Sequence, residues 1–378
     1  MTDYPFTIDN APGFDAVADQ FRQNFADGLE RGAQFVVLKD GKPVINMCGG
    51  WADDAQTKAV SHNTLIPVYS SGKAVAALVI AWLADEDRLG YDQIAATLWP
   101  DFAQKGKGEL TIAQVLSHQS GLSGITDPDF TRDDWFNWDK VCAALAAQDP
   151  LFPPGSASGY HPVTYGFLAG EIARLADKDN RTLGQILRDE LAAPLGADVW
   201  IGLPETEHHR VADMIKPKRM AKFGDMNPAV QAAFFQKHSS AGGTDITKWR
   251  KVELAGSNCH ASAHGLATLM QAFNAGKVGD HVVVAPDIVP RMRSPRISGQ
   301  DLVLPFDLTF AAGVMLNEPN FFFGPNAGTV GHSGWGGSCV FADPVTGLSG
   351  AYAMTRQDGT LLGDARPVGL IDAVYDCL

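Results

Sequence analysis

The chain has 378 residues, of which 45% are hydrophobic and 19% charged, and this composition is typical of a soluble globular protein rather than a disordered or fibrous one. The length predicts two domains, or one large domain with a long insertion. The formal net charge of −13 would repel phosphate backbones and anionic lipids, so we expect neither nucleic acid nor a membrane as a partner.

No segment predicts membrane insertion or export. The longest apolar stretch, Ala74 to Ala84, is too short for a bilayer, which needs about 20 residues. Residues 1–5 show neither a basic nor an apolar signal region, so we expect a cytoplasmic protein. The five cysteines lie far apart and form no Cys-x-x-Cys pair, which favours free thiols, mostly buried, over disulfides or a zinc knuckle.

Strand and helix signals occur near both ends of the chain. Apolar residues recur at helical spacing over residues 14–31, which predicts an amphipathic helix. Two β-prone runs follow, Phe35 to Leu38 and Val44 to Met47, and the Asp-Gly turn between them predicts a hairpin. A second hairpin is expected from Ser338 to Asp343 and Leu348 to Met354, followed by a C-terminal helix.

The middle of the chain is expected to be mostly helical. Its clearer helical segments are residues 112–116, 141–147, 166–175, 183–195 and 265–273. This order of elements predicts a mixed α/β (α+β) fold, in which an antiparallel sheet flanked by helices is built from both termini. We expect residues 1–89 and 305–378 to form this sheet-and-helix domain and residues 90–304 to form an inserted, mostly helical domain.

Ser70 and Lys73 form the first candidate catalytic pair. They lead directly into the apolar run, so Ser70 is expected in the first turn of a buried helix, with Lys73 one turn further on. Residues at i and i+3 share a helix face, which places the amine beside the hydroxyl, and a buried lysine can lose its proton and act as a base. The alternative is a helix-start serine with a solvent-reaching lysine, since Ser-x-x-Lys alone is common by chance.

Two later segments support the catalytic interpretation. A rigid loop rich in proline and glycine, residues 153–162, ends in Tyr160-His161-Pro162 just before a predicted helix. Residues 331–337, Gly-His-Ser-Gly-Trp-Gly-Gly, are predicted to form a glycine-rich strand, in which small residues let a substrate approach the backbone closely.

Together these motifs resemble the serine β-lactamase and penicillin-binding protein superfamily, and most closely its class C β-lactamase-like esterase branch, the family VIII carboxylesterases. That superfamily carries Ser-x-x-Lys, then a Tyr-x-Asn-type element, then Lys-Thr-Gly or a substitute containing His or Trp. Here Ser70 to Lys73, Tyr160 and His332 to Gly334 occur in the same order. Residues 116–122, Leu-Ser-His-Gln-Ser-Gly-Leu, also resemble a segment common in the family.

The resemblance implies a role for each matched residue. Ser70 would attack the substrate carbonyl, Lys73 and Tyr160 would share the proton transfers, and the backbone N–H groups of Ser70 and Trp335 would form the oxyanion hole. Which of Lys73 and Tyr160 is the base stays open. Neither a cofactor nor a metal is implied. The substrate would be bound by His332, Ser333, Gly334, Trp335 and His161.

The chain departs from the lactamase pattern at two positions. Pro162 stands where the Asn of Tyr-x-Asn would bind a lactam amide, and proline has neither a side-chain amide nor a backbone N–H. His332 stands where lactamases usually have a lysine, so a fixed positive charge becomes a group that is largely neutral at pH 7. Both changes favour an uncharged ester over a β-lactam.

Other segments invite competing interpretations. The chain lacks the Gly-x-Ser-x-Gly pentapeptide of an α/β-hydrolase. Cys259, His260 and His264 have spacing that suggests a metal, but a helix-start cluster fits better because no acidic general base is nearby. His118 is expected to be structural, and the basic segment 216–222 to be a solvated loop. Four aromatic residues are expected to line an acyl pocket or lid, or to pack in the core or at a subunit contact: Phe130, Trp135, Phe136 and Trp138.

The sequence therefore predicts a serine hydrolase that cleaves a small carboxylic ester through an acyl-enzyme on Ser70. The alternatives are a β-lactamase or D-amino-acid peptidase, an acyltransferase, and a non-catalytic penicillin-binding homologue. The sequence identifies no subunit interface and gives no oligomeric state.

Overall fold

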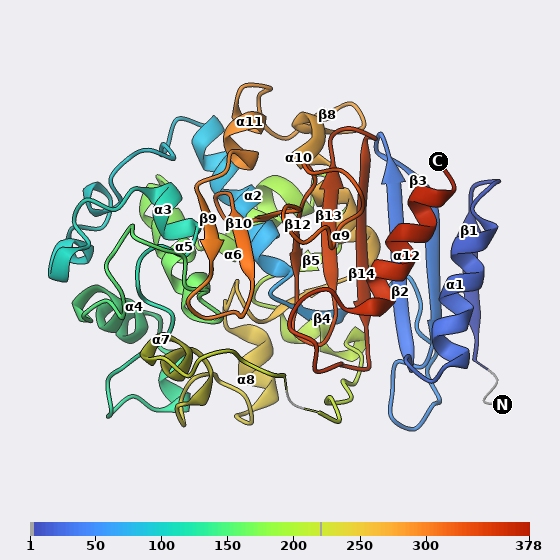
Figure 1. Ribbon diagram of the computed structural model, residues 1–378, viewed down its shortest axis with the longest axis horizontal. Coiled ribbons are helices and arrows are strands. Elements are labelled where there is room, and N and C mark those ends of the chain that lie inside the picture. The colour runs from blue at the N-terminus through green and yellow to red at the C-terminus, as the bar shows by residue number, and fades with distance from the viewer. Residues whose placement is uncertain (1–3, 220) are drawn as a thin grey trace.

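A computed structural model describes residues 4–219 and 221–378 of the chain. Within these residues, nine antiparallel strands form one sheet in the order β1-β3-β2-β14-β13-β12-β11-β10-β9 (Figure 1). Strands from both ends of the chain are neighbours in it, which confirms the predicted fold class. The strands are β1 (Phe6–Asn10), β2 (Gly32–Lys39), β3 (Lys42–Gly50), β9 (Ile297–Gln300), β10 (Asp307–Phe310), β11 (Met315–Leu316), β12 (Val330–Ser333), β13 (Cys339–Asp343) and β14 (Leu348–Met354).

Both predicted hairpins are confirmed. The turn between β2 and β3 has positive φ at Asp40 (50°) and Gly41 (79°), the backbone of a type I′ turn, whose twist matches that of the flanking strands. The turn between β13 and β14 ends at Gly347, which also has a positive φ of 73°. Strand β14 pairs with β2 through seven residues, from Leu348 opposite Lys39 to Met354 opposite Ala33.

Helices cover both faces of the sheet. Alternate residues of β2 point to opposite faces: Phe35 and Val37 belong to one buried core, and Val36 and Leu38 to the other. Helices α1 (Asp15–Ala26) and α12 (Ala365–Asp376) lie side by side on the first face (Figure 1). Helices α2 (Gly72–Asp85) and α9 (Ala263–Met270) cover the second face, so every central strand is buried on both sides.

The middle of the chain is largely helical, and all five predicted helical segments are confirmed. Among the described residues, no helix is both long and apolar enough to cross a membrane. The remaining α-helices are α3 (Ile112–Leu116), α4 (Trp138–Ala147), α5 (Thr164–Ala176), α6 (Leu183–Ile186), α7 (Pro228–Val230), α8 (Ile246–Lys251), α10 (Ala272–Ala275) and α11 (Ile288–Arg293). The 3₁₀- and π-helical segments are η1 (Ala95–Thr97), η2 (Pro100–Gly106), η3 (Arg132–Phe136), η4 (Leu187–Ala192), η5 (Glu205–Arg210) and η6 (Gln231–Phe235).

Two small sheets complete the fold. One has the order β4-β6-β5 and the other pairs β7 with β8. The first matters for function because β4 leads into the Ser70 turn and α2. Their strands are β4 (Ile66–Tyr69), β5 (Val199–Trp200), β6 (Cys259–Ala261), β7 (Lys277–Val278) and β8 (His281–Val282).

Three features of the structure differ from the sequence prediction. Helix α1 ends at Ala26 instead of residue 31, because Gly28 takes a positive φ of 72° that ends the helix. The glycine-rich strand ends at Ser333, and the glycines at 336 and 337 form a turn with φ of 88° and 115°. Strand β9 lies before residue 305 and pairs with β10 of the large sheet. The division into residues 1–89 with 305–378 and residues 90–304 stays a prediction.

Candidate active site

Ser70 lies in a sharp turn between β4 and α2. Tyr69 before it has a positive φ of 49°, and the Ser70 carbonyl accepts a hydrogen bond from the Lys73 N–H at 3.0 Å. Helix α2 begins at Gly72, so Ser70 lies two residues before the helix and not in its first turn as expected. A Cβ at position 72 would overlap the Cβ of Cys259 on β6, so glycine lets the helix start pack against this strand.

Lys73 is fully buried and its amine reaches Ser70. Its Nζ lies 3.0 Å from Ser70 Oγ, 2.9 Å from the Pro162 carbonyl oxygen and 2.8 Å from the Gly256 carbonyl oxygen. Burial lowers the pKa of the amine well below its ordinary value, because a low-dielectric site penalises the ammonium form. In the structure the Ser70 hydroxyl donates to the Gly256 carbonyl at 3.0 Å. In the neutral amine the two carbonyls use both N–H donors, so the lone pair can accept the hydroxyl proton once that hydroxyl turns towards Lys73.

Tyr160 completes the group around the serine. Its ring lies 4.8 Å from Lys73 Nζ and 4.8 Å from the ring of His118, measured to the ring centres. Burial raises the pKa of the phenol, and a side-chain hydrogen bond with Ser70 opposes part of that rise. The backbone N–H of Tyr160 donates to Asp301 Oδ1 at 3.0 Å, so a distant carboxylate fixes the position of the tyrosine.

The turn after β12 brings Trp335 to the same place. A Cβ on Gly334 would overlap the Val68 carbonyl oxygen and Ser338 Oγ, so the turn approaches the segment before Ser70 as closely as glycine allows. Ser338 Oγ holds the two segments together by donating to the Val68 carbonyl at 2.7 Å. The backbone N–H groups of Ser70 and Trp335 donate to no acceptor within residues 4–219 and 221–378, and such free donors suit an oxyanion.

The two histidines of the predicted site are buried. His161 Nε2 lies 2.7 Å from Ser120 Oγ and accepts the Leu122 N–H at 3.2 Å. His332 Nδ1 lies 2.8 Å from the Ser333 carbonyl oxygen. Burial, with a smaller contribution from the nearby Lys73, lowers the pKa of each imidazole to about 3. Both rings are therefore neutral at pH 7.

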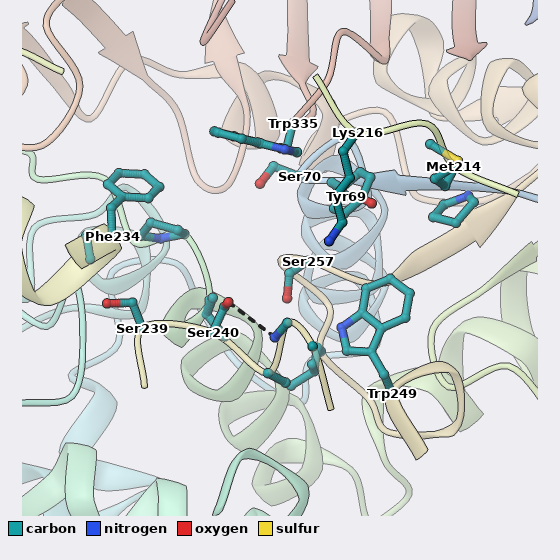
Figure 2. A pocket seen from close by; sticks show the side chains of 18 of the residues that line it. Tyr69, Ser70, Met214, Lys216, Phe234, Ser239, Ser240, Trp249, Ser257 and Trp335 are labelled. Carbon is teal, nitrogen blue, oxygen red and sulfur yellow. Dashed lines mark hydrogen bonds between the residues drawn. The ribbon is translucent and has the colours of Figure 1, made fainter. Parts of the chain in front are cut away.

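A cavity of about 650 Å³ opens in front of Ser70 (Figure 2). Of the predicted site residues, Ser70, Tyr160, Ser333 and Trp335 line it, whereas Lys73, His161, His332 and Gly334 are absent from its wall. The structure thus brings the proposed nucleophile, tyrosine and oxyanion loop to one cavity, with the lysine buried behind the serine. The other large apolar and aromatic side chains of the cavity wall include Tyr69, Phe223, Phe234, Phe235, Ile246, Trp249 and Leu304.

The four aromatic residues 130, 135, 136 and 138 do not line this cavity. Phe130 and Trp135 are buried in the core, and the Trp135 indole donates to the His238 carbonyl at 2.8 Å. The core-packing alternative is therefore correct for these two. Lys216 of the basic segment is an exposed loop residue, as expected, and it also lines the cavity.

Comparison with known proteins agrees with this geometry. Residues 21–373 match the family model described as Beta-lactamase. The chain belongs to the β-lactamase family. Esterase/beta-lactamase LipL from Mycobacterium tuberculosis is 30% identical over 366 residues, which cover 91% of this chain and 82% of LipL.

Solved structures of the β-lactamase family give close matches. A penicillin-binding protein homologue from Caulobacter crescentus is 50% identical, with a TM-score of 0.95 over 100% of each chain. A family VIII carboxylesterase is 38% identical, with a TM-score of 0.92 over 98% of this chain and 100% of its own. EstA from Arthrobacter nitroguajacolicus is 26% identical, with a TM-score of 0.85 over 97% of each chain.

Two groups of this β-lactamase-family site were missed by the sequence reasoning. Asp301 Oδ1 accepts three backbone N–H groups, from Tyr160, Val303 and Leu304. The Gly256 carbonyl accepts from both Ser70 Oγ and Lys73 Nζ, and a Cβ at this glycine would lie 3.0 Å from Lys73 Nζ. Neither has a sequence signal, since one acts through a remote carboxylate and the other through its backbone.

Proposed function

We propose that this serine hydrolase of the β-lactamase family cleaves small carboxylic esters through an acyl-enzyme on Ser70. The observation that carries the proposal is the buried amine of Lys73, which lies 3.0 Å from Ser70 Oγ, while Ser70 itself lines a cavity together with Tyr160 and Trp335. The names of the relatives point the same way, since one is an esterase/beta-lactamase and another a family VIII carboxylesterase.

In the proposed reaction, Ser70 Oγ attacks the ester carbonyl carbon and passes its proton to the neutral Lys73 amine. The N–H groups of Ser70 and Trp335 stabilise the oxyanion, and the electron pair returns as the bond to the leaving alkoxide breaks. The Lys73 and Tyr160 pair supplies the proton that the alkoxide takes up. Water then attacks the acyl-enzyme, which releases the acid and returns the proton to Ser70. The balance is ester plus water giving acid plus alcohol.

Two features favour an ester over a β-lactam. Pro162 supplies no side-chain amide for a lactam acylamide, and its carbonyl is already an acceptor for Lys73. His332 is buried and neutral at pH 7, since its pKa is about 3, and it therefore supplies no charge to a lactam carboxylate. Penicillin binding remains the second candidate because the 50% identical structure is described as a penicillin-binding protein homologue.

One experiment separates these activities. Wild type, Ser70→Ala and Ser71→Ala are compared for turnover of p-nitrophenyl acetate and nitrocefin, and for labelling by a fluorophosphonate and a fluorescent penicillin. Ester turnover and fluorophosphonate labelling that disappear only in Ser70→Ala support the proposal. Full ester turnover in Ser70→Ala contradicts it, whereas penicillin labelling of Ser70 without ester turnover favours the second candidate.

A further inference from the structure

The cavity has two unlike sides. Phe223 packs against Phe234 and Phe235 in an apolar part of the cavity wall, and the cations Lys216 and Arg250 are also among the lining residues. Figure 2 shows Phe234 on one side of Ser70, with Lys216 and Trp249 on the other. In a chain with a net charge of −13, two cations in the cavity beside the nucleophile are unexpected for an enzyme of neutral esters.

Both cations lack a side-chain partner in the part of the chain that the structure describes. Within the described chain, neither side chain forms an ion pair or donates a hydrogen bond, and Arg250 Nε is buried without an acceptor. Burial lowers the pKa of the guanidinium from its usual value, the direction expected for a charge whose lost hydration is not replaced. Arginine still remains cationic at neutral pH, so this part of the cavity wall carries a positive charge with no hydrogen-bonded counter-ion among the described residues.

One acidic residue faces the same space. Asp213 lines the cavity and opposes the pKa decrease of Arg250. Its Oδ2 instead accepts the Asp54 N–H at 3.2 Å, and its carboxylate is exposed. The charged side chains of the cavity are Lys216, Arg250 and Asp213, which leaves one net positive charge.

Hydrogen bonds of the backbone anchor the two segments that carry these cations. The Ile215 N–H donates to the Thr355 carbonyl at 2.8 Å and anchors the Lys216 segment beside the large sheet. Arg250 lies on α8, and Asn258 Nδ2 donates to the Trp249 carbonyl at 2.6 Å in that helix. Next to this helix, Ser257 lines the cavity, and its Oγ is a buried atom without a hydrogen-bond partner among the described residues.

We infer that Lys216 and Arg250, with the hydroxyl of Ser257, bind a carboxylate of the substrate, so that the preferred esters are anionic. The inference rests on the proposed ester hydrolysis and replaces the expected neutral ester with one that carries a carboxylate. The apolar side of the cavity would receive the hydrocarbon part of the same substrate. The carboxylate belongs either to the acyl group or to the alcohol, and the two sources are separated by the substrates below.

The test compares matched pairs of anionic and neutral esters. For the acyl side the pair is mono-p-nitrophenyl glutarate and p-nitrophenyl hexanoate; for the alcohol side it is 4-acetoxybenzoate and its methyl ester. The measured quantity is the anionic-to-neutral ratio of kcat/KM, compared between each variant and wild type so that intrinsic reactivity and general damage cancel. Lys216→Gln and Arg250→Gln remove one charge each, and Lys216→Arg and Arg250→Lys restore it.

We expect Lys216→Gln and Arg250→Gln each to lower this ratio by roughly tenfold in one of the two arms, the lower limit for a hydrogen bond to a charged group at a partly exposed site. The restoring variants should keep most of the wild-type ratio. Lys218→Gln and Lys248→Gln are the controls, because these exposed lysines lie on the same segments outside the cavity, and they should keep the wild-type ratio.

Unchanged ratios in both arms for Lys216→Gln and Arg250→Gln would overturn the inference, as would an equal loss in the two controls. If Arg250→Gln does not fold, Lys216→Gln alone decides the result. Ester turnover that survives in Ser70→Ala would instead overturn the proposed function. If ester turnover depends on Ser70 but the variants show no effect on the anionic-to-neutral ratio, only the carboxylate subsite is overturned and the proposed function stands.

Discussion

Adding one methyl group at Gly334 should damage the reaction more than the fold. A Cβ there would overlap the Val68 carbonyl oxygen and Ser338 Oγ, and would lie 3.0 Å from Ser71 Oγ. The serine hydroxyls can rotate away, but a backbone carbonyl cannot, so the β12 turn must move away from the Ser70 turn. Overpacking of this kind costs about 1 to 3 kcal/mol in the free energy of unfolding.

The rate effect should be larger because Trp335 follows Gly334 directly. If the Trp335 N–H moves with the turn, one of the two proposed oxyanion donors loses its position, which costs about 10²- to 10³-fold in kcat. The assay is kcat for p-nitrophenyl acetate in Gly334→Ala, together with chemical denaturation. Gly328→Ala is the matched control, since a Cβ there meets nothing within 4 Å. Wild-type kcat in Gly334→Ala would refute this reasoning.

Three further predictions concern the groups around Ser70. Lys73→Ala and Tyr160→Phe should each lower kcat at least about 10²-fold, and steady-state kinetics of the double variant should show far less than the product of the two losses. Because burial lowers the pKa of Lys73, kcat/KM should fall as pH decreases through that pKa and the amine gains a proton. His332→Gln should not change the pH at which this decrease in kcat/KM occurs, since the pKa of His332 is about 3. A shift of that pH in the pH–rate profile would mean that the histidine titrates in the reaction. Asp301→Ala removes the acceptor of three backbone N–H groups and should lower the free energy of unfolding by about 2 to 4 kcal/mol in urea titration, with a smaller loss in Asp301→Asn.

The sequence predicted the parts of this fold that depend on local pattern. The Asp40-Gly41 turn and the β-prone runs around it identified the first hairpin, because a type I′ turn needs residues that tolerate positive φ. The i, i+3 spacing of Ser70 and Lys73 predicted their contact, which is 3.0 Å in the structure. Ser70 lies just before the helix, but a turn closed by the Lys73 N–H and the Ser70 carbonyl keeps the two side chains together. Such spacing is a local property, so it can be predicted without knowledge of the rest of the chain.

Contacts between distant segments were out of reach of this reasoning. Ser70 and the Gly256 carbonyl are 186 residues apart, and Tyr160 and Asp301 are 141 apart. A backbone carbonyl exists at every position and so has no signature, and an isolated aspartate in a loop resembles any other. The place of Lys216 in the cavity wall has no signal in its exposed loop either, because it depends on segments far away in the sequence.

The central claim, an acyl-enzyme on Ser70, is tested most directly by trapping the intermediate. The enzyme is mixed with excess p-nitrophenyl acetate, quenched in acid within the first turnovers, digested and analysed by mass spectrometry. The account predicts one acetyl group on the peptide that contains Ser70, and no such adduct in Ser70→Ala. An acetyl group on another residue, or unchanged turnover in Ser70→Ala, would contradict it.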